Sequence, residues 1–138
     1  LFKYIKPGIT SNEVLDKASA DMKNYIKDKK FVKPGHLKAV EQGLEFRGHF
    51  QHPVGMAVHD VGRVRGATLQ PGMVFTIDPM IWLHDERLYI RIEDVALVTE
   101  DGVENMSAFV PSKLEDVERT IKEKGLIQFR PPVSLPLK

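Results

Sequence analysis

The chain has 138 residues, with 20 Lys or Arg against 19 Asp or Glu, so its formal net charge is +1 with the histidines neutral. Hydrophobic residues make up 42% and charged residues 28%, which is typical of a globular protein and excludes a disordered or collagen-like chain. Its apolar runs are far shorter than the roughly 18 residues of a membrane span. Its charge shows no basic surplus of the kind that nucleic-acid-binding proteins carry. We therefore expect neither a membrane nor a nucleic acid as a partner.

The sequence contains no cysteine, which excludes disulfide scaffolds and thiolate zinc sites. Its first residues, Leu1 to Lys6, are not followed by the apolar segment of a signal peptide. We predict a cytoplasmic location. Because the chain begins with Leu rather than Met, we also expect further sequence upstream in the parent gene.

Two helices are predicted in the first third of the chain. Thr10 and Glu13 have the spacing of a capping box, and apolar residues recur after them at helical spacing until about Lys30. A second and weaker helix is predicted over residues 37–44, where Gly43 is an unfavourable interior residue.

Strand patterns occupy the middle of the chain. Apolar residues alternate with others over residues 54–58, which predicts a strand. Two longer strands are predicted over 73–83 and 88–99, on either side of the polar loop 84–87. A short strand is predicted over 103–106.

The C-terminal part is predicted to be a helix and a tail. Ser112 and Glu115 have the spacing of a second capping box, and Gly125 is a plausible end for the helix that follows. Residues 129–138 contain three prolines and are predicted to be extended or disordered.

The hairpin in the middle of the chain brings two acids face to face. If its loop is centred between Asp85 and Glu86, opposed residues have numbers that sum to 171. Asp78 and Glu93 then lie directly opposite, with Cβ atoms about 5 Å apart. Their neighbours are apolar, so this pair persists only if one acid is protonated or a cation lies between them. Arg91 lies on the same face as Glu93 and can offset charge or contact a ligand.

A slipped register is the alternative for the same two strands. A turn centre shifted by one or two residues would separate the acids. Both would then lie in solvent, or would pair with Arg87 and Arg91.

Three histidines, His49, His52 and His59, fall within eleven residues. A flat strand cannot place His52 and His59 on one face because their separation is odd, whereas a bend at Pro53 or Gly55 can. Imidazole and carboxylate together are ligands of Zn, Mn, Co or Fe, and such a site with an open position can generate hydroxide. Scattered histidines are also common as surface or core residues, and the spacing alone leaves both interpretations open.

Three motifs occur in a familiar order: HPVGMAVHDVG at 52–62, LQPGMVFTIDP at 69–79 and RIED at 91–94, preceded by IKPGIT at 5–10. Together they resemble the aminopeptidase P and prolidase family, the pita-bread metallopeptidases of peptidase family M24. The resemblance covers residues 1–124. It implies an α+β fold that is the C-terminal portion of the pita-bread fold, with a curved antiparallel sheet and helices packed on one face.

The resemblance implies a role for each candidate site residue. His52, Asp78 and Glu93 match metal-ligand positions, and Glu93 is the ligand that bridges two metals. Asp78 also matches the carboxylate that shuttles a proton. His59 matches the histidine that contacts substrate and steadies the tetrahedral intermediate, and Arg91 matches a site arginine of the Xaa-Pro peptidases. The family uses two divalent ions (Mn, Co or Zn) and no other cofactor, and the resemblance favours the register in which the two acids face each other.

The sequence departs from the family pattern in two ways. Most members carry Glu where this chain has Asp78, which is one methylene shorter, and His49 is not at the position of the upstream family histidine and is assigned no metal role. The family also takes two aspartate ligands from an upstream half-domain, and none precedes residues 5–10 here. Residues 1–128 are therefore predicted to be a partial pita-bread catalytic domain that lacks its upstream half, and residues 129–138 a Pro-rich tail.

The function implied is that of the C-terminal part of a dinuclear metal-dependent aminopeptidase or dipeptidase that cleaves short Xaa-Pro peptides. The isolated chain is expected to bind at most one metal ion, weakly, and to be inactive or weakly active. It is also expected to form a homo-oligomer that covers the face left by the missing half. Two alternatives remain: a non-catalytic pita-bread module that binds proteins, and a metal-free C–N hydrolase of the creatinase type.

Overall fold

The structure of the protein is a computed structural model that describes residues 1–129. The chain divides into two compact units, with the boundary between Ala108 and Phe109. The sequence-based boundary after residue 128 stays a prediction. Apart from Phe129, the predicted Pro-rich tail lies outside the described residues.

The first unit begins with two helices, after a short 3₁₀ turn η1 (Phe2–Tyr4). Helix α1 (Ser11–Ile26) begins at the predicted capping box: the Glu13 amide donates to Thr10 Oγ1 at 3.2 Å, and the Thr10 amide donates to Glu13 Oε2 at 2.8 Å. The start of this helix is thus confirmed, and its end at Ile26 comes before the predicted one.

Helix α2 (Pro34–Glu45) is longer than the predicted helix over 37–44. It begins with Pro34 in its first turn, where the missing N–H costs no intrahelical hydrogen bond. Gly43 is accepted inside it because the carbonyl oxygen of Met80 lies 3.1 Å from the place where a Cβ would be. A residue that lowers helix propensity here permits close contact between the helix and a strand.

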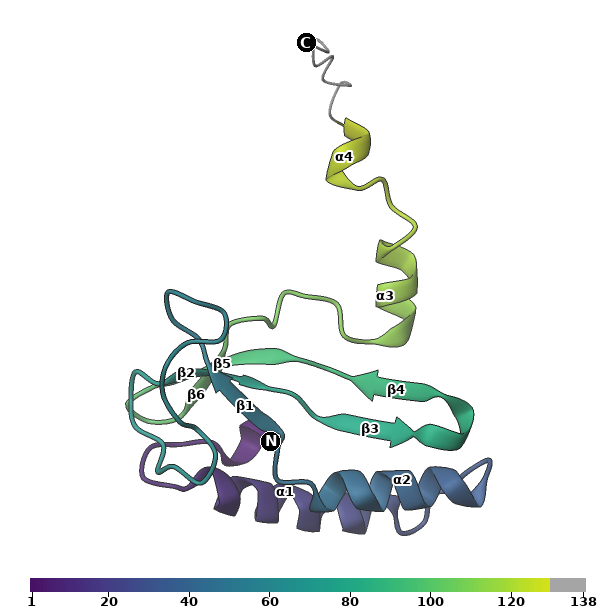
Figure 1. Ribbon diagram of the computed structural model, residues 1–138, viewed down its shortest axis with the longest axis horizontal. Coiled ribbons are helices and arrows are strands. Elements are labelled where there is room, and N and C mark those ends of the chain that lie inside the picture. Colours follow the sequence, from purple (N-terminus) through teal and green to yellow (C-terminus); the bar gives the residue numbers. More distant parts are fainter. Residues whose placement is uncertain (130–138) are drawn as a thin grey trace. The chain divides into compact units, whose positions relative to one another are not determined.

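The first unit contains two antiparallel sheets. One has four strands in the order β1-β2-β5-β6, and the other is the two-stranded ribbon β3-β4. Helix α1 packs on the four-stranded sheet and α2 packs on β3, so the two helices cover one face (Figure 1). The strands are β1 (Phe50–Pro53), β2 (Val74–Ile77), β3 (Met80–Leu83), β4 (Leu88–Arg91), β5 (Asp94–Val98) and β6 (Val103–Asn105), with a 3₁₀ turn η2 (His84–Glu86) between β3 and β4.

The predicted register of the long hairpin is confirmed. Partners run from Val74 opposite Leu97 to Ile77 opposite Asp94, and the register continues without slippage through the β3–β4 ribbon to Leu83 opposite Leu88. The slipped register is therefore wrong.

The predicted continuous strands 73–83 and 88–99 are wrong, because each is broken into two. Pro79 has no N–H to offer the ladder, and the amide of Asp78 donates instead to the carbonyl of His49 at 2.7 Å. The two breaks leave Asp78 and Glu93 between the two sheets.

The predicted strand over 54–58 is also wrong. The strand is β1, which ends at Pro53, and the residues after it form a bent loop. The apolar residues of this alternating pattern do not form a buried face, since Met56 is fully exposed and Val58 is largely exposed. The Asp60 carboxylate instead accepts hydrogen bonds from loop amides, and the Asp60 amide donates back to the Pro53 carbonyl at 3.2 Å.

The core of the first unit lies between α1 and the four-stranded sheet. Phe50 and Phe75 are fully buried, and their ring centroids are 5.4 Å apart. Val14 and Leu15 of α1 belong to the same buried cluster. This packing fixes β1 and β2, the two strands that carry or precede the candidate ligands His52 and Asp78.

The second unit contains α3 (Leu114–Thr120) and α4 (Leu126–Phe129). The predicted capping box at Ser112 is wrong, because Lys113 is the residue that caps α3 and it makes no side-chain cap hydrogen bond. With the helix starting one residue later, Glu115 stands one position too early to close a box. None of the helices in residues 1–129 is long and apolar enough to cross a membrane.

Candidate metal and peptide site

Asp78 is the buried centre of the candidate site. Its side chain is fully inaccessible, and it lies where β2 ends and β3 has not yet begun. Oδ2 accepts a hydrogen bond from Arg91 at 2.8 Å, whereas Oδ1 has no hydrogen-bond partner among the described residues. A buried carboxylate oxygen without a donor is uncommon in folded proteins, and it is a suitable ligand for a cation.

The environment of Asp78 favours its neutral form. Burial raises the pKa of this carboxyl, and the negative charge of Glu93 raises the pKa further. The positive charge of Arg91 and the nearby ring of His52 lower the pKa, but they offset the increase only in part.

Arg91 joins the two acids that the hairpin places opposite each other. Its Nη2 lies 2.8 Å from Asp78 Oδ2 and 2.6 Å from Glu93 Oε2. The sequence predicts that this carboxylate pair needs a cation or a proton, and in the structure the cation is this guanidinium. Asp78 is inaccessible, whereas Glu93 and Arg91 are both about two-fifths exposed, so the pair is buried at one end only.

His52 lies beside the acids on β1. Its Nε2 is 3.9 Å from Glu93 Oε1, and its Nδ1 is 3.1 Å from the carbonyl oxygen of Pro53. Since a carbonyl only accepts, Nδ1 donates in this contact, and Nε2 is the ring nitrogen that faces Glu93. A ring nitrogen held by a carbonyl, with the other nitrogen free to bind, is the usual arrangement of a metal-ligating histidine.

His59 returns to the site through the bent loop after β1. Its ring stacks on the ring of His52, with centroids 4.1 Å apart and an interplanar angle of 21°. The bend predicted near Pro53 or Gly55 therefore does bring the two histidines together.

The structure brings all five predicted site residues together but does not form a closed metal cage. Within residues 1–129, no three His, Asp or Glu side chains are close enough to hold a metal ion. Arg91 lies between Asp78 and Glu93, and His52 is still 3.9 Å from its neighbouring acid. The donor atoms have the right chemistry for a divalent metal, and the unpartnered Asp78 Oδ1 fits such an ion, provided that Arg91 moves.

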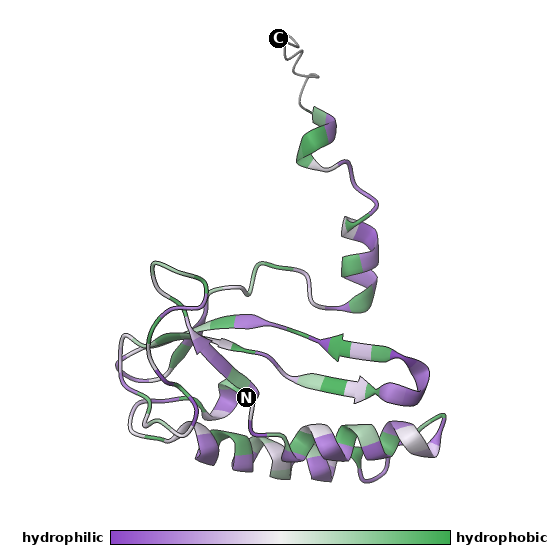
Figure 2. Ribbon diagram, in the orientation of Figure 1, coloured by the Kyte–Doolittle hydropathy of each residue, from purple (hydrophilic) through white to green (hydrophobic). Residues whose placement is uncertain are grey.

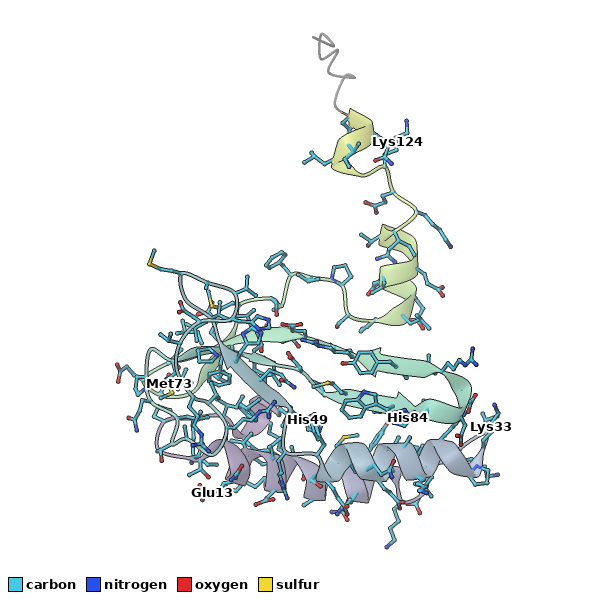
Figure 3. The ribbon with its side chains drawn as sticks, viewed as in Figure 1. Glu13, Lys33, His49, Met73, His84 and Lys124 are labelled. Atoms are coloured by element: carbon cyan, nitrogen blue, oxygen red, sulfur yellow. The ribbon has the colours of Figure 1, made fainter. Side chains whose placement is uncertain are left out.

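Sequence reasoning missed the residue that holds Asp78 in place. His49 is buried, its carbonyl accepts the Asp78 amide at 2.7 Å, and its Nε2 is 2.6 Å from the carbonyl oxygen of Gly43 (Figure 3). Its Nδ1 lies 3.4 Å from the carbonyl oxygen of Asp78, so both ring nitrogens face backbone carbonyls. No local pattern could predict this contact, because His49 and Asp78 are 29 residues apart.

Asp94 makes its hydrogen bonds away from the acid pair. Its Oδ1 accepts hydrogen bonds from Ser107 Oγ at 2.7 Å and from Asn105 Nδ2 at 3.1 Å. These contacts tie β5 to the residues around β6, so Asp94 stabilises the sheet and is separate from the Asp78–Glu93 pair.

Comparison with known proteins gives a consistent result. The sequence model of the family described as "Metallopeptidase family M24" matches residues 1–100 of this chain. Xaa-Pro aminopeptidase 2 of Streptomyces coelicolor is 30% identical over 131 residues, which is 83% of this chain and 28% of that protein. Human Xaa-Pro aminopeptidase 3 is 38% identical over 102 residues, which is 62% of this chain and 20% of that protein.

Solved structures of aminopeptidase P have the same fold. Zinc-substituted Escherichia coli aminopeptidase P in complex with product superposes with a TM-score of 0.61 at 28% identity, over 90% of this chain and 32% of that one. Proline aminopeptidase P II from Yersinia pestis also gives 0.61 at 28% identity, over 88% and 31%. The predicted α+β fold, a portion of the pita-bread fold, is confirmed, and the chain spans less than a third of these relatives.

Proposed function

The chain belongs to the M24 metallopeptidase family, and from this premise we propose that it is part of the catalytic domain of a metal-dependent aminopeptidase. We further propose Xaa-Pro peptides as substrates, because the curated relatives that it matches are named Xaa-Pro aminopeptidases. The observation that carries the proposal is that His52 lies 3.9 Å from Glu93, beside a buried Asp78 whose Oδ1 has no hydrogen-bond partner among the described residues.

The proposed ligands are Nε2 of His52 and the carboxylates of Asp78 and Glu93. A divalent metal at such a site supplies a water molecule that is acidic enough to act as hydroxide at neutral pH. We propose two ions, drawn from Mn, Co and Zn, in the complete domain, and at most one weakly bound ion in this chain. Asp78 is the shorter homologue of the glutamate that most family members carry.

The remaining site residues act on the peptide. His59, next to His52, donates to the carbonyl oxygen as negative charge develops there. Asp78 takes a proton and passes it to the leaving amine. Arg91 orders Glu93 through its 2.6 Å contact, or binds the carboxylate of a short peptide when it is free of the acids.

We propose that an upstream half-domain completes the site with two further acidic ligands. Supporting this, the apolar residues Leu88, Tyr89 and Ile90 of β4 are 44–48% exposed, and Figure 2 shows the hydrophobic colouring of that strand. Apolar surface of this kind is commonly covered by a partner. Association of two copies of this chain is the other arrangement that would cover it.

One observation favours a second candidate, a protein-binding module without catalysis. Arg91 already forms ion pairs with both Asp78 and Glu93, so the described residues fold with a cation at the acid pair that is not a metal ion. A module of this type would keep the three residues for stability alone, and its fold would be indifferent to metal.

The test is hydrolysis of Xaa-Pro dipeptides and tripeptides by the longest natural polypeptide that carries this segment, with and without a chelator. His52→Ala should lower kcat/KM by more than about 100-fold, the upper end of what changes just outside a metal's ligands cost. His36→Ala is the matched control, because that ring contacts Glu86 and not the site. Activity that resists both the chelator and His52→Ala would contradict the proposal.

A further inference from the structure

We propose that Arg91 is a built-in counter-ion that competes with the divalent metal for the carboxylates of Asp78 and Glu93. On this view the metal binds only when the guanidinium leaves, and Arg91 sets the affinity of the site. The inference rests on the proposed function, because it concerns the regulation of the same metal site.

The first step of the argument is where the positive charge lies. A single atom, Nη2 of Arg91, contacts Oδ2 of Asp78 at 2.8 Å and Oε2 of Glu93 at 2.6 Å. One positively charged group therefore bridges one oxygen from each acid, which is also the position that a cation between the two acids would take. A guanidinium and a divalent ion cannot share it, because like charges repel and the oxygens are already occupied.

The second step is that the guanidinium only partly satisfies the acids. Oδ1 of Asp78 stays without a hydrogen-bond partner among the described residues, and the carboxyl is inaccessible to solvent. A metal ion, which accepts several oxygen ligands at once, would satisfy the oxygen that the guanidinium leaves without a partner. Coordination of this unpartnered oxygen therefore favours replacement of the guanidinium by a metal ion.

The third step is that the Arg91 side chain has room to move toward solvent. Arg91 is the last residue of β4. The side chain of Arg91 is 38% exposed, and that of Glu93 is 40% exposed. The backbone after it leaves the ribbon, and the Ile92 amide donates to the Pro79 carbonyl over a long 3.3 Å. The arginine and Glu93 can therefore turn toward solvent while Asp78 stays fixed by His49.

The competition has a quantitative consequence. If the state with a displaced guanidinium is a minor one, the measured dissociation constant equals the intrinsic constant divided by the population of that state. Removing the guanidinium removes this factor, so Arg91→Met should bind metal more tightly even though it takes away no ligand and adds none.

The experiment compares Mn²⁺ binding by the purified chain and by Arg91→Met, using calorimetry after chelator treatment. We expect Arg91→Met to bind Mn²⁺ about tenfold more tightly, the factor for a competent state populated near one part in ten. Arg87→Met is the matched control: Arg87 stands in the turn before β4 and makes no ion pair among the described residues, so its variant should keep the wild-type affinity.

Two further measurements keep the inference testable if Arg91→Met folds poorly. Arg91→Lys keeps the charge, so its Mn²⁺ affinity should stay close to that of the wild type. In the wild-type chain, the nitrogen resonance of the Arg91 side chain, assigned by its absence from Arg91→Lys, should shift when Zn²⁺ is added. A resonance that stays in place while Zn²⁺ binds would overturn the inference.

The outcomes separate this inference from the proposed function. Equal Mn²⁺ affinity in wild type and Arg91→Met overturns the competition and leaves the metal site standing. If neither protein binds Mn²⁺, both the competition and the metal site in this chain are overturned. Tighter Mn²⁺ binding by Arg91→Met, with unchanged binding by Arg87→Met, supports both the competition and the metal site.

Discussion

Burial of the Asp78 carboxyl makes the metal-free fold depend on pH. Its pKa is raised, chiefly by burial and then by the charge of Glu93, so the folded chain holds this proton more tightly than the unfolded chain does. The stability contributed by such a group is fully present below the ordinary Asp pKa, 3.8, and is lost as the pH rises through the higher folded pKa.

Asp78→Asn tests this link, because it keeps the shape of the side chain and removes its charge. In the presence of a chelator, the free energy of unfolding of Asp78→Asn relative to wild type should rise as the pH goes from about 4 to about 7. Urea unfolding at several pH values measures the difference. A difference that stays constant over this range would show that the carboxyl titrates alike in the folded and unfolded chain.

The individual site residues differ in how far the sequence could predict them. Counting residues from the hairpin loop was enough to oppose Asp78 and Glu93, because sheet register is a local rule. That Arg91 shares a face with Glu93 also followed from strand periodicity, but its reach to Asp78 depends on the break between the sheets. The hold of His49 on Asp78 depends on tertiary packing between distant segments, and no spacing rule contains it.

At the scale of elements, two capping boxes with the same sequence spacing have different outcomes. The box at Thr10 forms, since α1 begins at the next residue and Val14 and Leu15 anchor it in the core. The box at Ser112 does not form. Leu114 of α3 is 68% exposed, so no comparable packing fixes where that helix begins.

This contrast gives a matched pair of variants. Thr10→Ala should lower the free energy of unfolding by about 1 kcal/mol, the usual cost of losing an N-cap side chain. Ser112→Ala should change it by less than about 0.5 kcal/mol, because it removes an exposed side chain that caps nothing. Chemical denaturation followed by circular dichroism measures both, and equal losses in the two variants would contradict this account.

Strand prediction failed where pattern and burial disagree. Residues 54–58 alternate like a strand, but Met56 and Val58 are exposed, so the alternation reflects no buried face. In the long hairpin, apolar residues continue on both sides of Asp78 and Pro79, but the strand is broken there because proline cannot donate to the ladder. The bent loop and the broken strands are the features that bring His59 and Asp78 to the site.

For the molecule as a whole, the described residues correspond to part of the longer aminopeptidase P chains. The chain covers less than a third of the length of the solved aminopeptidase P chains. The side chains of Leu88, Tyr89 and Ile90 in β4 are about half exposed. The order of three motifs was enough to predict the family and the partial fold. The position of Arg91 between the acids was not, because the resemblance implies a metal there and the structure has a guanidinium.

The central claim is that His52, Asp78 and Glu93 form the part of a metal site that this chain supplies. Equilibrium dialysis of the purified chain against Mn²⁺, alongside Glu93→Gln and the control Glu104→Gln from β6, tests it most directly. The account predicts one weakly bound ion per chain in the wild type and in Glu104→Gln, and none in Glu93→Gln. Equal binding by Glu93→Gln and the wild type would contradict it, as would two ions per chain with hydrolysis of Xaa-Pro peptides.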